Sequence, residues 1–129
     1  MRQMTLMEKY PVFVLEIPKA ETSHDSVDSI VAFLKQKIAE TDKVAFISVF
    51  DHVEHTRSIG GDIAPNIKAG KNVVFCFGFA LPNPMVMAVR PRSIGVCDTG
   101  DAFVISFMEA PMKPANDAME AWAKAIKDR

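Results

Sequence analysis

The pattern of a β-strand recurs in five short apolar runs, all rich in Val, Ile and Phe. These runs are residues 12–17, 44–50, 72–78, 93–98 and 102–109. Prolines close the first run at both ends, which favours an edge strand. The second and third runs are apolar at nearly every position, so we expect both faces to be covered. The last two runs flank Asp98–Asp101, where Gly100 can adopt the positive φ of a tight turn, and this indicates a hairpin.

The pattern of an amphipathic helix occurs twice, near residues 24–40 and 116–128. In both, apolar residues repeat at i, i+3, i+4 and i+7, the spacing of one helix face. The predicted buried stripes are Val27, Ile30, Val31, Leu34 and Ile38 in the first helix, and Met119, Trp122, Ala123 and Ile126 in the second. Thr22 or Ser23 is the expected N-cap of the first helix, and Asn116 that of the second.

The order strand, helix, four strands, helix predicts an α+β fold. We expect a mostly antiparallel five-stranded sheet with both long helices on one face. A length of 129 residues fits one domain, residues 1–129, and no internal repeat divides it.

Composition excludes some classes of function. The net charge is −1, with 24% charged and 49% hydrophobic residues, so the basic excess of a nucleic-acid-binding protein is missing. No segment approaches the ~20 apolar residues of a membrane helix, and the first residues do not resemble a secretory signal. We therefore expect no nucleic-acid or membrane partner and a cytoplasmic location. The two cysteines are expected to be buried free thiols.

The segment "DHVEH", residues 51–55, is the first candidate for chemistry. Asp51 and Glu54 have the spacing of a capping box, which predicts a short helix after the second strand. His52 and His55, three residues apart, face the same way on such a helix, and metal sites use this spacing. No other His or Cys has the spacing of further ligands. We therefore expect no metal and no cofactor, and we interpret the two histidines as solvated, or as part of a ligand site or interface.

The segment "NPMVMAVRPR", residues 83–92, is the second candidate. Asn83-Pro84 predicts a helical turn whose Met85 and Met87 are too apolar to remain in water. This turn either plugs one end of the sheet, contacts a second copy, or lines an adaptable apolar pocket. Arg90 and Arg92 suit a carboxylate or phosphate group, although such arginines more often pair with surface carboxylates.

Two classes of function remain open. The first is a binding or regulatory module that homodimerises and holds a small apolar or anionic ligand beside residues 85–92. A dimer is expected because two helices cover only one face of a sheet whose strands are apolar on both faces. The alternative is a small enzyme or redox protein with His52 as general base, Arg90 and Arg92 as anion clamp, or Cys76 as thiolate. Cys76 lies among Val and Phe, where desolvation disfavours the thiolate.

Three short strings also suggest a family. They are Asp51-His52 after the second strand, Phe77-Gly78 followed by prolines after the third, and "SFMEAP" at the end of the hairpin. In this order they resemble domain-of-unknown-function family 302, small bacterial and archaeal proteins, although an insertion after Gly78 departs from the pattern. The resemblance implies a TATA-binding-protein-like fold with a curved antiparallel sheet, and a homodimer. It implies no reaction.

Overall fold

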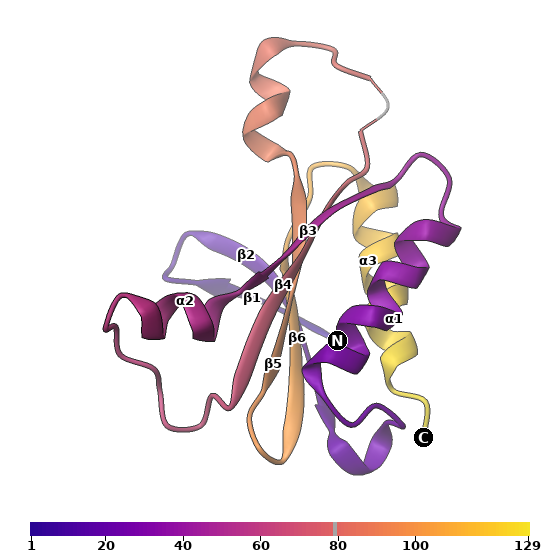
Figure 1. The fold of residues 1–129 in the computed structure, drawn as a ribbon. Coiled ribbons are helices and arrows are strands. Elements are labelled where there is room, and N and C mark those ends of the chain that lie inside the picture. Colours follow the sequence, from indigo (N-terminus) through magenta and orange to yellow (C-terminus); the bar gives the residue numbers. More distant parts are fainter. Residues whose placement is uncertain (79) are drawn as a thin grey trace.

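The computed structural model describes residues 1–78 and 80–129 and contains one antiparallel sheet with helices packed on it (Figure 1). The strands are β1 (Arg2–Leu6), β2 (Tyr10–Pro18), β3 (Ala45–Asp51), β4 (Ala69–Cys76), β5 (Arg92–Asp98) and β6 (Ala102–Met108). The helices are α1 (Val27–Glu40), α2 (His52–Ser58) and α3 (Lys113–Ile126), with short 3-10 helices η1 (Lys19–Glu21) and η2 (Pro84–Val89). The strand order is β1-β2-β6-β5-β4-β3, and the α+β class is confirmed.

The sheet has six strands, so the predicted count of five is wrong, and the TATA-binding-protein-like order is not confirmed. The missed strand, β1, is only five residues long, so the alternation of Gln3 and Thr5 with Met4 and Leu6 is too short to predict a strand. Its turn into β2 is built by Met7 and Glu8 at positive φ, 52° and 62°, without the glycine or asparagine that usually marks such a turn. Because β1 pairs with one side of β2, β2 is an inner strand and not the expected edge.

The core lies between the sheet and the helices α1 and α3, which cover the same face (Figure 1). Every residue of the two predicted apolar stripes is buried, so both helix faces are confirmed. On the sheet side the core is aromatic: Phe75 packs edge-on against Phe77 and Trp122, and Phe77 stacks on Trp122 with ring centroids 5.6 Å apart. The pattern of the helices therefore located the core correctly.

The predicted N-caps of these helices are wrong. Ser26 caps α1, and its Oγ accepts from the Ser29 N–H at 3.0 Å. The Thr22 hydroxyl instead donates to the Ile126 carbonyl at the end of α3, at 2.6 Å. Asn116 lies inside the first turn of α3, where its side chain bonds to the backbone N–H and C=O of Ala110, both at 2.7 Å. The side chains of Thr22 and Asn116 bond to groups outside the helix end that each was predicted to cap, so neither acts as an N-cap.

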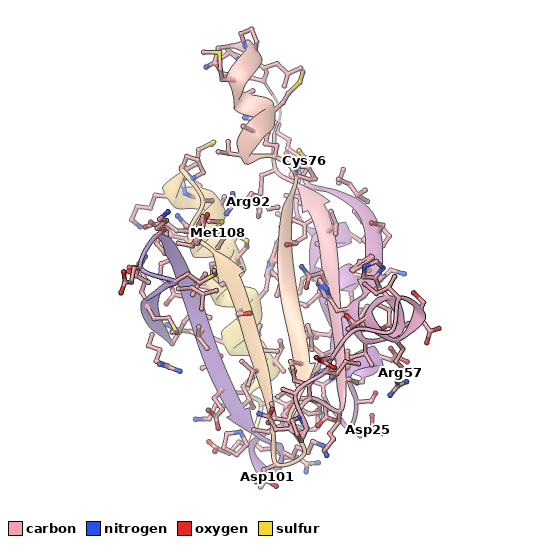
Figure 2. All side chains as sticks on the ribbon, turned by 90° about the vertical axis from the view of Figure 1, so that its left-hand side faces the viewer. Asp25, Arg57, Cys76, Arg92, Asp101 and Met108 are labelled. Carbon is pink, nitrogen blue, oxygen red and sulfur yellow. The ribbon has the colours of Figure 1, made fainter. Side chains whose placement is uncertain are left out.

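The other face of the sheet is not covered by the long helices. In Figure 1 the helix α2 and the hairpin β1–β2 both stand out on this side, and the sheet curves between them. Residues 80–91, which we call the arm, extend beyond the sheet between β4 and β5 (Figures 1 and 2). The expectation that the turn in this segment is covered is wrong within one chain, because Met85 is 71% and Met87 63% exposed.

Candidate functional site

A concave surface, which we call the trough, lies on the sheet face that α1 and α3 leave open (Figure 2). Two adjoining hollows of about 290 and 310 Å³ make up this surface. They share the floor residues Asn72, Gly95, Val104 and Ser106, which come from β4, β5 and β6. The trough is therefore continuous across the middle of the sheet.

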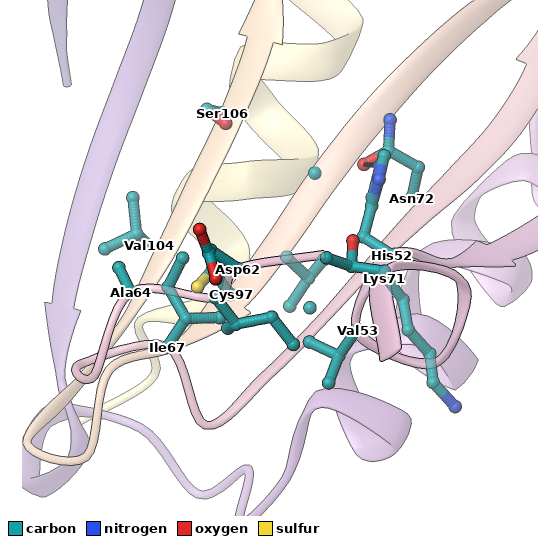
Figure 3. Close-up of a pocket in the computed structure, with 15 residues that line it drawn as sticks. His52, Val53, Asp62, Ala64, Ile67, Lys71, Asn72, Cys97, Val104 and Ser106 are labelled. Atoms are coloured by element: carbon teal, nitrogen blue, oxygen red, sulfur yellow. Dashed lines mark hydrogen bonds between the residues drawn. The ribbon is translucent and has the colours of Figure 1, made fainter. Parts of the chain in front are cut away.

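A row of hydrogen bonds crosses one side of this floor. The Nε2 atom of His52 lies 3.1 Å from Oδ1 of Asn72, and Nδ2 of Asn72 donates to Oγ of Ser93, also at 3.1 Å. Since the Asn72 oxygen only accepts, this contact is a hydrogen bond when Nε2 of His52 carries a proton. The first residue of α2 is thereby fixed to the sheet, and Figure 3 shows His52 and Asn72 side by side at the trough.

Gly95 keeps the centre of the floor open. A Cβ atom at this position would lie 3.3 Å from both Oδ1 of Asn72 and Oγ of Ser106. The two polar atoms thus flank a space that any other residue would fill. Among the described residues the Ser106 hydroxyl has no hydrogen-bond partner, so it can donate to and accept from a bound molecule.

The walls of the trough are apolar. Val53 of α2 and Ile63 and Ile67 of the following loop line one hollow, and Met4 and Leu6 of β1 line the other. Asp62 is the acidic side chain among the lining residues. Lys71 points away from the hollow in Figure 3, and its Nζ lies 2.7 Å from Oδ1 of Asp28. The trough thus combines an aliphatic lining with a few fixed polar groups, which is typical of small-molecule sites.

Cys97 also lines the trough, but it is not an activated nucleophile. Burial raises the pKa of its thiol, and the neighbouring Asp98 carboxylate raises it further. The protonated thiol is a weak nucleophile, so Cys97 contributes apolar surface rather than reactivity. Both cysteines are free thiols and half-buried.

His52 and His55 do lie on one side of α2, as their spacing predicted. Both rings pack against Phe50, with centroids 4.8 and 5.4 Å from it. In residues 1–78 and 80–129, no three His, Cys, Asp or Glu side chains gather into a group that could hold a metal ion. Of the two histidines, His52 lines the trough and His55 does not.

Asp51 caps α2 as predicted, because its Oδ1 accepts from the Glu54 N–H at 2.9 Å. We expect Asp51→Ala to lower the free energy of unfolding by about 0.5–2 kcal/mol, the usual cost of losing an N-cap. Urea denaturation gives this value. Asp51→Asn is the matched control, because the amide oxygen can still accept that bond. An equal loss in both variants would mean that the charge of Asp51 matters more than the cap.

The other predicted site residues lie at a different end of the molecule. Arg90 donates to the Ala80 carbonyl at 2.6 Å, and Arg92 donates to the carbonyls of Val89 and Met108. Figure 2 shows Arg92 beside Met108. Burial lowers the pKa of Arg92. Both arginines border a small hollow of about 70 Å³ between the arm and the start of α3, where they hold the base of the arm.

The residues of the alternative enzymatic interpretation do not converge. Cys76 and Arg90 line a shallow depression beside the arm, whereas His52 is bonded to Asn72, four residues earlier on β4. Four residues of a strand span about 13 Å. Within residues 1–78 and 80–129, the hollow that His52 lines and the depression that Cys76 and Arg90 line are therefore separate, and an enzymatic role for these three residues is not supported.

Three residues of the trough floor, Asn72, Gly95 and Ser106, were not predicted as site residues from the sequence. They stand at alternate positions of otherwise apolar strands, so they share a sheet face with Ser93 and Val104. Polar and small residues at every second position of a strand indicate a sheet face that does not pack against the core. This signal is present in "RSIGVCD" and "AFVISFM", but it was interpreted only as a hairpin.

Among the described residues, none of the helices combines the length and apolar character needed to cross a bilayer.

Comparisons with known proteins identify the family but no function. Neither the curated proteins nor the solved structures gave a match. One family model, described as a family of unknown function, DUF6858, matches residues 1–128. The expectation of an uncharacterised domain family is thus confirmed, although family 302 itself is not. Because the match spans nearly the whole chain, the protein belongs to family DUF6858.

Proposed function

We propose that this protein is a binding module that holds a small molecule in the trough. The ligand has an aliphatic body and one uncharged hydrogen-bonding group, such as a hydroxyl or a carbonyl. The observation that carries the proposal is the floor around Gly95, where Asn72 and Ser106 flank an open space inside an apolar hollow. The resemblance to family 302 stays a prediction and has no part in this argument.

The polarity of the trough supports an uncharged ligand. Asn72 and Ser106 offer neutral donors and acceptors, and the Asp62 carboxylate in the lining disfavours an anion. Arg90 and Arg92, the earlier candidates for an anion, use N–H groups on backbone carbonyls and lie at the arm. Anion binding beside residues 85–92 therefore remains a prediction with less support than the trough.

A titration with 1-octanol tests this proposal, because the alcohol has an aliphatic chain and one hydroxyl. We expect saturable changes in the amide chemical shifts of Gly70, Gly95 and Ser106, which lie on the trough floor. Ser106→Leu removes the free hydroxyl and fills the hollow, so it should weaken binding about tenfold or more. Shifts that do not saturate, or that centre on the arm, would contradict the proposal.

Thr5→Leu is the matched control for this experiment. Thr5 pairs with Pro11 in the β1–β2 ladder, on the opposite sheet face from Met4 and Leu6, which line the trough. This variant adds the same kind of side chain to the same sheet without entering the trough. Its affinity for 1-octanol should equal that of the unchanged protein, and a similar loss in both variants would point to a general effect on the fold.

A further inference from the structure

The edge strand β3 has an unusual surface. It is the last strand in the sheet order, so its outer backbone N–H and C=O groups face no other strand of the described chain. Residues 44–50 carry no charge, and Phe46, Ile47, Val49 and Phe50 are all exposed apolar side chains. Strand edges with these properties readily pair with another strand, and proteins normally protect them.

The opposite edge of the same sheet is protected. β1 is short, begins with Arg2 and alternates Gln3 and Thr5 with its apolar residues. Charged and polar side chains on a short strand are the usual means of preventing edge pairing. Residues 45–50 of β3 carry no charged side chain, and only the bulge at Ile47 interrupts them, so we interpret the exposed β3 edge as an interaction surface.

The arm enlarges this apolar surface. Ile47 lines the depression at the base of the arm together with Leu81 and Met87. Ile47 is 51%, Leu81 68% and Met87 63% exposed. A single strand edge buries too little area for a stable complex, for which about 800 Å² per partner is typical. The strand and the arm together form a broader patch, in which the flexible methionines can adapt to a partner.

We propose that a second copy of this chain occupies the edge, with the two β3 strands antiparallel about a two-fold axis at Ile47. In this register residue numbers on facing strands add up to 94. The facing positions are Ile47 with Ile47, Phe46 with Ser48, Ala45 with Val49, and Val44 with Phe50. Lys43, a turn residue with a φ of 62°, then comes beside Asp51 just beyond the paired segment. The pairing joins two six-stranded antiparallel sheets into one.

Charge complementarity favours this occupant. Lys43 precedes the uncharged segment and Asp51 ends it, so a two-fold axis at its centre places opposite charges beside each other at both ends. Because the axis is two-fold, the match of Lys43 with Asp51 occurs twice, once at each end of the paired segment. An unrelated strand does not provide this repeated match. Ile47 is skipped in the pairing of β3 with β4, where a register shift marks a bulge. An axis through the bulge gives both strands the same local bend.

Sedimentation velocity between about 1 and 100 µM tests the proposal on the full chain. We expect a species of twice the 14.2 kDa chain mass that dissociates on dilution. Ile47→Lys places two like charges at the axis and should weaken the dimer about 100-fold or more. Thr5→Lys, the same charge on the protected edge β1, should leave it unchanged. A chain that remains a monomer at 100 µM would overturn the proposal.

Crosslinking tests the register independently. Facing residues of an antiparallel pair have Cα atoms about 4.5–5.5 Å apart, within the range of a disulfide. With Cys76 and Cys97 replaced by serine, Ile47→Cys should form a covalent dimer under mild oxidation, and Thr5→Cys should not. If the dimer forms but survives Ile47→Lys and gives no Ile47→Cys crosslink, another surface, such as the trough face, holds the two copies, and the β3 proposal is wrong.

Discussion

Replacing Leu34 by alanine is expected to lower the free energy of unfolding by about 2–5 kcal/mol. Leu34 is 0% exposed and lies in the middle of the α1 stripe that packs on the sheet. Alanine favours the helix itself, so the loss comes from missing contacts and from the cavity left in the core. Urea denaturation followed by the fluorescence of Trp122, the one tryptophan in the sequence, measures this difference.

Leu6→Ala is the matched control, because the same side chain is removed from an exposed position on β1. It should cost about 1 kcal/mol, since nearly half of that residue already faces water. Both variants are compared at one protein concentration, so that self-association does not enter the difference. Equal losses at the two positions would mean that α1 does not bury its predicted stripe.

Asn116→Ala is expected to lower the free energy of unfolding by about 1–3 kcal/mol. The Asn116 side chain satisfies both the N–H and the C=O of Ala110, at 2.7 Å each, and Ala110 is buried. Without these bonds the two backbone groups remain unsatisfied where β6 connects to α3. Because alanine is the better helix former, helix propensity acts in the opposite direction and does not produce the loss.

Asn116→Asp separates this explanation from a loss of packing. Aspartate keeps the acceptor for the Ala110 N–H but loses the donor, and its charge then faces the Ala110 carbonyl. We therefore expect destabilisation at neutral pH that diminishes when the carboxyl group is protonated. A pH-independent loss equal to that of Asn116→Ala would show that the bond from the Ala110 N–H, which aspartate keeps, contributes nothing and that the charge has no effect.

The candidate site was only partly predictable. The spacing of His52 and His55 placed both on one side of a short helix, and the structure agrees. Both rings pack on Phe50, and His52 also bonds to Asn72. Arg90 and Arg92 were candidates for holding an anion or for pairing with surface carboxylates, whereas they donate to carbonyls of the arm and of β6. In each case the residue type indicated a capacity for binding, and the chain around it determined which group was bound.

The sequence by itself determined the features that depend on local periodicity. The helix stripes, the five apolar strands, the β5–β6 hairpin and the Asp51 cap all arise from residues close in the chain, so their pattern was sufficient. Only the tertiary structure determined which residues that are far apart in the sequence contact each other. Thr22 bonds to a residue 104 positions away, and His52 to one 20 positions away, and such partners displaced local roles. The strand order also left β3 as an uncharged edge and made Gly95 the centre of an open trough, because it set which residues share a face.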